Sequence, residues 1–197
     1  MNNLKAVSFL NFLRQFGELP DELARAIQEK STYLELPKKH ILFRQGKVCN
    51  QLYFIEKGLA RNYYEVDGKE QTTDISLNDE LLVSFSSFIS RKPSLENIEL
   101  LEDCTLYALE YEDLQDLYAN FKEMERLGRL MAEHYFISLA AKNYSLKFQN
   151  TTERYENLFR MKIEIIKRVP IGVIASYLGM SIETLSRIRA KELKKKK

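Results

Sequence analysis

The sequence predicts an α+β protein in which an antiparallel β-roll is followed by a long helix and a C-terminal helix-turn-helix. Three observations support this order. Short apolar runs separated by turn residues fill the first half, an apolar stripe with helical spacing crosses 112–148, and 171–188 have the pattern of two short helices joined at a glycine. We therefore expect three units, at 1–111, 112–148 and 149–197.

The first unit opens with helices between residues 5 and 29, the second of which starts at Pro20-Asp21. Strands are expected at 41–43, 52–55, 59–64, 72–75, 98–101 and 106–109. Glycine, proline and Asn-Asp turn signals separate them, and Asp67-Gly68 gives the strongest prediction of a hairpin. Strands at this close, regular spacing favour a roll or barrel over about 36–110.

The long helix carries two apolar stripes. The first has steps of three and four residues: Leu114, Leu117, Phe121, Met124, Gly128, Met131, Tyr135 and Ser138. The second lies beside it: Leu127, Leu130, His134, Ile137 and Ala141. One small roll cannot bury both stripes, so we expect one to face a second copy of the chain. The expected homodimer interface is Leu117, Phe121, Met124, Gly128, Met131 and Tyr135. The alternative is a helix that packs on its own domain and has no partner.

The segment IGVIASYLGMSIETLSRI, residues 171–188, has the spacing of a helix-turn-helix. Ala175 is small where two helices cross, and Gly179 stands where the first helix ends and the chain needs a positive φ. Ser181 is placed to cap the second helix. An ordinary helical hairpin is the alternative.

The outward face of this second helix is polar and suits DNA. The expected DNA-binding residues are Ser181, Glu183, Thr184, Ser186, Arg187, Arg189 and Lys191. Such side chains contact base edges and phosphates. Charge agrees, because residues 159–197 contain 11 basic and 3 acidic residues, a net charge of +8 in a chain whose total is +2. A basic end on an acidic body is typical of a polyanion-binding module. Double-stranded DNA is therefore the expected partner.

Other classes of protein lack support. The sequence contains no glycine-rich phosphate loop, nucleophile elbow or HExxH motif, so it predicts no catalytic residues and no enzyme. Cys49 and Cys104 are far apart, and His40 and His134 have no companions, so we expect no metal site and no cofactor. No run reaches the roughly 20 apolar residues of a membrane helix, and no signal peptide is recognised. We expect a reduced, cytoplasmic protein without a membrane partner.

With these residues in place, the chain resembles the Crp/Fnr family of bacterial transcription regulators along essentially its whole length. FRQG ending at Gly46, LYFIEKG ending at Gly58 and VDGKE around Gly68 match the glycine pattern of the family's cyclic-nucleotide-binding-like roll, a double-stranded β-helix. SIETLSRI is similar to its recognition helix, and Glu183, Ser186 and Arg187 resemble the Fnr-like branch, which reads TTGA-type half-sites. The resemblance implies a homodimer on an inverted repeat, and RNA polymerase as a further partner.

The sequence departs from the family at two places. Where cAMP-binding members carry Gly-Glu and later an Arg-Ser pair, this chain has NDELLVSFSSFISRKPSLE, with Asp79 in the glycine position. Cyclic nucleotide binding is therefore not expected. The candidate effector pocket is Glu80, Leu82, Ser84, Arg91 and Ser94. A β-hairpin wing usually follows the recognition helix, whereas here a tail ends in Lys194–Lys197, and we expect those lysines to contact phosphates instead. The alternative function is a small-ligand sensor or interaction module whose helix-turn-helix is vestigial or ligand-gated.

Overall fold

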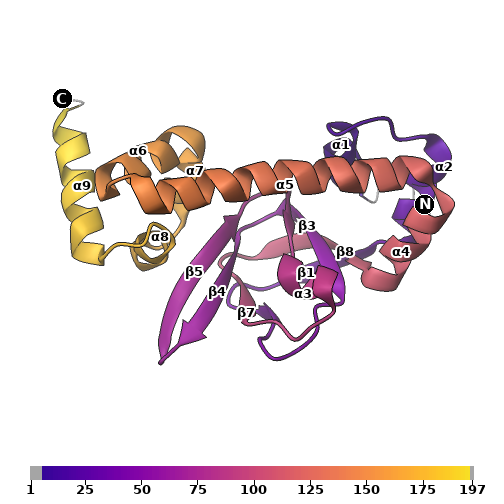
Figure 1. Cartoon of the computed structure of the whole chain (residues 1–197), viewed down its shortest axis with the longest axis horizontal. Coiled ribbons are helices and arrows are strands. Elements are labelled where there is room, and N and C mark those ends of the chain that lie inside the picture. Colours follow the sequence, from indigo (N-terminus) through magenta and orange to yellow (C-terminus); the bar gives the residue numbers. More distant parts are fainter. Residues whose placement is uncertain (1–5, 196–197) are drawn as a thin grey trace.

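The computed structural model describes residues 6–195, of which 192–195 are described by their backbone alone. The longest helix, α5 (Lys122–Phe148), runs along the molecule and connects its two ends. Figure 1 shows the β-roll below α5, the N-terminal helices at one end and the C-terminal helices at the other. The predicted class, an α+β protein with an N-terminal antiparallel roll, is confirmed.

The roll consists of two four-stranded antiparallel sheets. One has the order β1-β8-β3-β6, formed by Thr32–Leu36, Cys104–Glu110, Gln51–Lys57 and Glu80–Leu82. The other has the order β2-β7-β4-β5, formed by Ile41–Phe43, Glu96–Leu100, Ala60–Val66 and Lys69–Ser76. Ile55, Ile98, Leu100 and Leu106 are fully buried between the sheets. Alternate side chains of each strand point into this core, which is the period that the sequence shows.

The six predicted strands are all present, but the roll begins at Thr32 rather than near residue 36, because β1 pairs along its length with β8. The three-residue strand β6 was not predicted either. Between β6 and β7 the chain forms a short helix, α3 (Phe85–Ser90). The Asp67-Gly68 hairpin is confirmed, since both residues have positive φ, 51° and 72°.

The sheet that contains β3 and β8 is covered on its outer face by helices. These are α1 (Val7–Arg14), α2 (Asp21–Lys30), α4 (Tyr111–Asn120) and the start of α5. Phe9 on α1 stacks on Phe54 of β3, with ring centroids 5.1 Å apart. Leu117 and Met124 are buried in the same cluster, which therefore fixes the start of α5 on the roll.

The stretch predicted as one helix over 112–148 is two helices. At Phe121 the backbone is extended, with φ −132° and ψ 105°, and the chain turns so that α4 packs back on α5. Gly128 makes that contact possible, since a Cβ there would lie 2.4 Å from the Tyr118 hydroxyl. The small residue therefore serves a crossing of α4 and α5 within the chain.

The C-terminal unit has four helices: α6 (Thr151–Met161), α7 (Ile163–Arg168), α8 (Ile171–Tyr177) and α9 (Ile182–Lys195). The N-cap of α6 is Asn150, whose side chain accepts the N–H groups of Thr152 and Glu153. Glu153 in turn accepts the N–H of Asn150, which completes a capping box. This cap ends the long helix and starts the unit that carries the candidate site.

Candidate DNA-binding interface

Helices α8 and α9 form the predicted helix-turn-helix. Gly179 ends α8 with φ +64°, and the N–H groups of Met180 and Gly179 donate to the carbonyls of Ala175 and Ser176. This pair of hydrogen bonds is a Schellman motif, in which a left-handed residue satisfies the last carbonyls of a helix. Beyond the turn, the Ser181 hydroxyl accepts the N–H of Thr184 at 3.2 Å and caps α9, as predicted.

The two helices hold each other through a buried face. The residues that form this contact are all buried: Ile174, Ala175, Leu178, Leu185 and Ile188. They share one apolar cluster with Tyr155 and Leu158 of α6. Because α9 buries one face against α6 and α8, its other face must point outward.

That outward face carries most of the predicted DNA-binding residues. Glu183, Ser186, Arg187 and Lys191 are exposed, whereas Thr184 and Arg189 are half-buried. The Arg187 guanidinium lies along the helix surface and donates to the Thr184 hydroxyl at 3.3 Å. The pKa of the Glu183 carboxyl is held below its ordinary value by a hydrogen bond from its own backbone N–H. A hydrogen bond with the Ser181 side chain and the positive charge of Arg187 lower this pKa further. The face thus presents the Arg187 guanidinium, a planar group with several donors, beside the Glu183 carboxylate, which accepts hydrogen bonds.

Ile182 is an apolar residue on this polar face. It starts α9 and is 47% exposed, next to Glu183. Its Cδ1 lies 3.6 Å from the position that a Cβ would take at Gly172, so the tip of the Ile182 side chain packs on the start of α8. An exposed aliphatic group at this place can contact a thymine methyl in a major groove.

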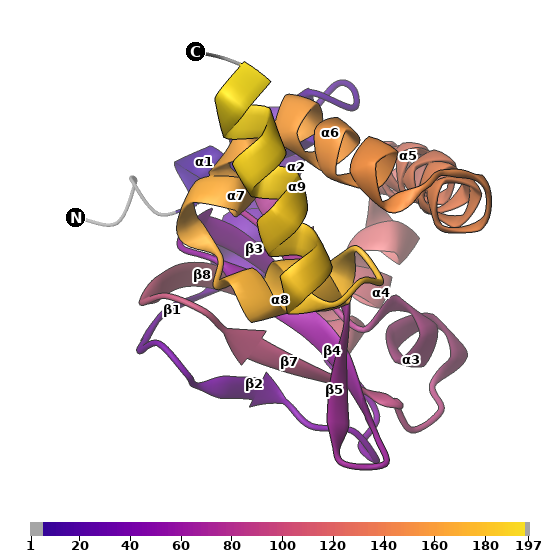
Figure 2. The same ribbon diagram turned by 90° about the vertical axis from the view of Figure 1, so that its left-hand side faces the viewer.

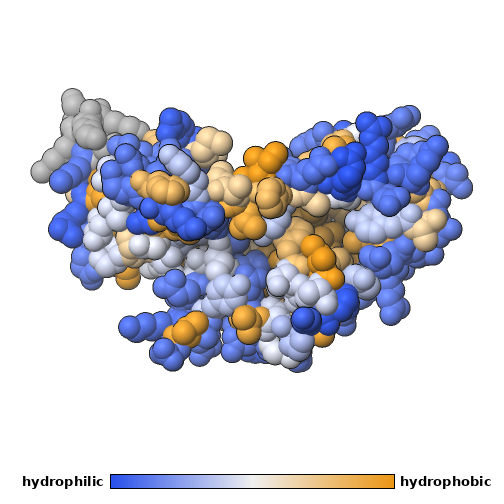
Figure 3. All heavy atoms as spheres, in the orientation of Figure 1, coloured by the Kyte–Doolittle hydropathy of each residue, from blue (hydrophilic) through white to orange (hydrophobic). Residues whose placement is uncertain are grey.

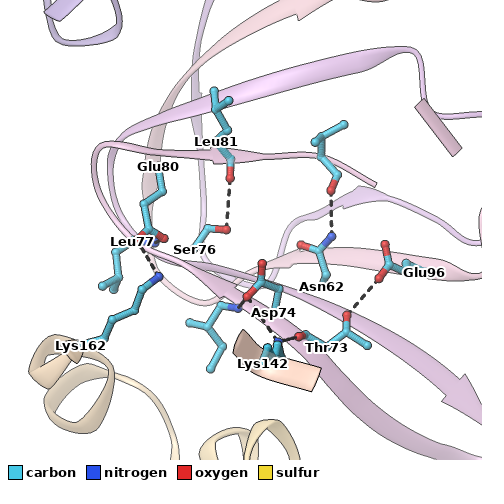
Figure 4. A network of polar contacts seen from close by, with 12 residues as sticks. Asn62, Thr73, Asp74, Ser76, Leu77, Glu80, Leu81, Glu96, Lys142 and Lys162 are labelled. Atoms are coloured by element: carbon cyan, nitrogen blue, oxygen red, sulfur yellow. Dashed lines mark hydrogen bonds and ion pairs between the residues drawn. The ribbon is translucent and has the colours of Figure 1, made fainter. Parts of the chain in front are cut away.

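Not all the basic residues of the C-terminal unit are available to DNA. Lys162 pairs with Glu80 at 2.7 Å, and Arg168 pairs with Glu102 at 2.6 Å, so both face the roll. Figure 4 shows Lys162 reaching toward Glu80 of β6. Part of the charge asymmetry in the sequence therefore reflects attraction between the basic unit and its own acidic roll. The Lys194–Lys197 side chains lie outside the described residues.

The predicted effector pocket is not assembled. Glu80 is held by Lys162, Leu82 is fully buried in the core of the roll, and Arg91 lies over the ring of Tyr111 at 3.8 Å. Ser84 and Ser94 do meet, with their hydroxyl oxygens 2.9 Å apart. The five residues are therefore engaged in separate contacts within the chain, and of these residues only Ser84 and Ser94 lie together.

The space beside Ser84 is lined by other side chains of the chain. Ser84 and Thr73 both donate to the Glu96 carboxylate at 3.0 Å, so a carboxylate lies beside the Ser84–Ser94 pair. Phe85 of α3 packs on Tyr135 of α5, with ring centroids 4.1 Å apart and the ring planes tilted by 31°. Burial raises the pKa of Tyr135 to about 12, so its phenol is neutral. The sequence alone did not predict the contact between Phe85 and Tyr135.

The six residues predicted for the dimer interface all have contacts within their own chain. Leu117 and Met124 are buried, Phe121 and Met131 pack on the N-terminal cluster, and Gly128 and Tyr135 contact Tyr118 and Phe85 of their own chain. This stripe therefore covers the chain's own domain. The exposed large apolar residues of α5 are Phe136, Ile137, Leu139, Tyr144, Leu146 and Phe148. They include Ile137 of the second predicted stripe.

Two residues that join the roll to the C-terminal unit were not found from the sequence. Lys142 of α5 and Ser176 of α8 both donate hydrogen bonds to β5. The sequence does contain a signal for Lys142. This charged residue stands four positions after Ser138, where the spacing of the first apolar stripe would place its next member. Nothing in the sequence singles out Ser176, whose partners lie more than 100 positions away.

Within the described part of the chain, no cluster of three or more His, Cys, Asp or Glu side chains could hold a metal ion. No described helix is long and apolar enough to span a membrane. Cys49 and Cys104 are both buried and free.

Comparison with known proteins identifies the type of domain that the roll represents. Residues 33–121 match the cyclic nucleotide-binding domain, which is the roll together with α4. The chain is thus a cyclic nucleotide-binding-type roll joined to a helix-turn-helix.

The relatives then indicate the family. The chain is 26% identical over 181 residues to the anaerobic regulatory protein of Pasteurella multocida, and 26% identical over 181 residues to the fumarate and nitrate reduction regulatory protein of Vibrio cholerae. Each alignment covers 85% of this chain, and the chain spans 64% and 70% of the lengths of these relatives. A structure from Eubacterium rectale described as a Crp/Fnr-family regulator has a TM-score of 0.69 and 18% identity, over 93% of this chain and 88% of that one. The resemblance to the Crp/Fnr family that the sequence suggests is confirmed by these matches.

Proposed function

We propose that the chain is a homodimeric, sequence-specific DNA-binding transcription regulator that reads an inverted repeat with α9. The observation that carries the proposal is the exposed face of α9, where Glu183, Ser186 and Arg187 stand outward over a buried apolar face. Figure 1 shows α9 at the far end of the molecule, beyond the roll and running across the end of α5. A duplex can approach it there without meeting the roll.

The chemistry of this face suits a major groove. An arginine donates two hydrogen bonds to guanine, and a carboxylate accepts from the amino group of cytosine. Arg187 and Glu183 are one helical turn apart and both exposed, so they can reach bases on neighbouring pairs. The interaction-module alternative would need these two side chains buried or paired across an interface, and both are exposed.

The dimer is proposed to form along α5, with residues other than the six predicted. Phe136 and Phe148 are 70% and 72% exposed, and they occupy the same helix as Ile137 and Tyr144. Figure 3 shows apolar atoms gathered over the middle of α5, in a hollow between the N-terminal and C-terminal lobes. A second α5 can lie in this hollow, and a two-fold axis along α5 would place both copies of α9 at one end.

The regulator is proposed to act without a cyclic nucleotide. The Glu96 carboxylate faces Ser84 and Thr73, and the Arg91 guanidinium is engaged at Cys49 and Tyr111. A cyclic phosphate would therefore meet an anion and no cation, which is costly in a partly buried site. The wider expectation of a cofactor-free regulator that contacts RNA polymerase and functions in the cytoplasm remains part of this proposal.

The deciding experiment is selection of bound sequences from a random DNA pool at physiological salt, with the wild type and Arg187→Ala in parallel. We expect the wild type to enrich a palindrome with two half-sites about one helical turn, roughly 34 Å, apart. The variant should lose that enrichment while it still binds DNA weakly at low salt. Recovery of no preferred sequence by the wild type would contradict the proposal.

A further inference from the structure

The edge strand of the second sheet is covered by the helix-turn-helix unit. β5 is the last strand in the order β2-β7-β4-β5, so its outer N–H and C=O groups have no neighbouring strand. The N–H of Thr72 donates to the Ser176 hydroxyl oxygen at 2.8 Å, and that hydroxyl donates to the carbonyl of Glu70 at 3.2 Å. One side chain of α8 thus satisfies two groups of the exposed edge. Figure 2 shows α8 lying between α9 and the β4–β5 hairpin.

Lys142 of α5 makes the second connection. The β4–β5 register shifts between Asn62 and Tyr63, so that Thr73 has no partner on β4 and its carbonyl is free to accept from the Lys142 ammonium. The same ammonium lies 3.7 Å from the Asp74 carboxylate and 4.2 Å from the centre of the Tyr177 ring. Figure 4 shows the Lys142 contacts with Thr73 and Asp74. One cation therefore joins α5, β5 and α8.

Apolar packing closes the junction beneath these polar contacts. Leu59, Ile75 and Leu101 of the roll belong to the same buried cluster as Ile174 and Leu178 of the helix-turn-helix. The C-terminal unit and the roll therefore share a core, and α8 cannot turn without disturbing both. The polar groups at its rim decide the angle, because hydrogen bonds are directional and apolar contacts are not.

We propose that Lys142 and Ser176 are positioning residues that fix the direction of α8 against α5, and so set the separation of the two α9 helices. The inference rests on the proposed function, since α5 is the dimer helix and α9 the reading helix. Gly179 joins α8 to α9 by a tight turn, so the direction of one determines the other. Two rigidly held recognition helices accept one half-site spacing, whereas loosely held ones accept several.

The first test uses the full chain without DNA. It compares Lys142→Met combined with Ser176→Ala against a control with Lys147→Met and Ser138→Ala, two exposed positions on α5. Methionine keeps the length of the lysine chain but removes its donors. We expect hydrogen exchange in residues 69–76 to become at least tenfold faster in the junction variant, with β3 and β8 unchanged and the control like the wild type. Unchanged exchange at 69–76 would overturn the inference. Should the double variant fail to fold, Ser176→Ala alone carries the test.

The second test measures affinity for operators whose half-sites are separated by different numbers of base pairs. We expect the wild type to prefer one separation by at least tenfold and the junction variant to bind several separations within about threefold of each other, while its dimer mass is unchanged. A merely destabilised protein would lose affinity at all separations equally, and that result, or a spacing preference as sharp as in the wild type, would overturn the inference. Absence of DNA binding by the wild type would instead refute the proposed function, and the exchange measurement would still decide whether the two residues hold α8.

Discussion

The Arg168 guanidinium of α7 lies 2.6 Å from the Glu102 carboxylate on the turn between β7 and β8, and it also donates to the carbonyl of Gly58 at 3.1 Å. Arg168 is thus bound to two points of the roll. The hydrogen bond from Arg168 is the main reason that the pKa of Glu102 is lowered. The contribution of this ion pair to the free energy of unfolding therefore depends on pH.

The first prediction concerns that pair. Since the folded state lowers the pKa of Glu102, its contribution to stability is present above the unfolded pKa and is lost as pH falls through the folded pKa. A partly exposed ion pair contributes about 0.2–1 kcal/mol. Glu102→Gln should therefore lower the free energy of unfolding by that amount at pH 7 and by nothing measurable near pH 2, in urea titrations at both pH values. A difference that persists at acid pH would show that the carboxylate charge is not the cause. Glu112→Gln, at an acidic residue in the first turn of α4, is the control.

The second prediction concerns base reading by Arg187. A good bidentate contact contributes about 1–3 kcal/mol of base discrimination. Arg187→Ala should thus weaken binding to the selected palindrome by about 5-fold to 150-fold per half-site, measured by fluorescence anisotropy. Arg187→Lys should restore charge but not discrimination, because an ammonium lacks the fork. Full recovery with lysine would assign Arg187 to a phosphate.

The third prediction concerns the dimer. Ile137→Glu places a charge on the exposed apolar face of α5, 68% exposed in the single chain, and should convert the dimer to a monomer at micromolar concentration. Sedimentation equilibrium measures the change. Lys122→Glu, at the exposed start of α5, should leave the dimer intact. An Ile137→Glu protein that remains dimeric would move the interface to another surface.

The fourth prediction concerns Gly128. In an open helix, Gly→Ala stabilises by about 1 kcal/mol. Here a Cβ would lie 2.4 Å from the Tyr118 hydroxyl, so Gly128→Ala should instead destabilise by about 1–3 kcal/mol. Adding Tyr118→Ala should remove the clash, and the double-mutant cycle in guanidinium should then give a favourable coupling. Additive effects would show that the crossing of α4 and α5 is loose.

The fifth prediction concerns effectors. cAMP or cGMP at millimolar concentration should leave the melting temperature unchanged, because Glu96 lies where a phosphate would need a cation. Glu96→Gln, tested alongside, removes the repelling charge. Clear stabilisation of the wild type by either nucleotide would contradict the proposal that the regulator acts without one.

Local pattern determined much of this protein. The alternation of apolar residues, Asp67-Gly68, Gly179 and Ser181 specify strands, a hairpin and a helix-turn-helix, because each acts within a few residues. The sequence also places Arg187 and Glu183 on the outward face of α9, since that side is opposite Leu185 and Ile188.

The tertiary structure decided what each face meets. The sequence does not show which of the two apolar stripes is buried in the chain's own domain. In the fold, Met124 packs in the cluster that includes α4, and Tyr135 packs on Phe85 of α3. In the sequence, Lys162 and Arg168 count toward a basic DNA-binding surface. In the fold, they form ion pairs with Glu80 and Glu102 of the roll. Contacts such as Thr72 with Ser176 join residues more than 100 positions apart, and no local periodicity encodes such a pairing.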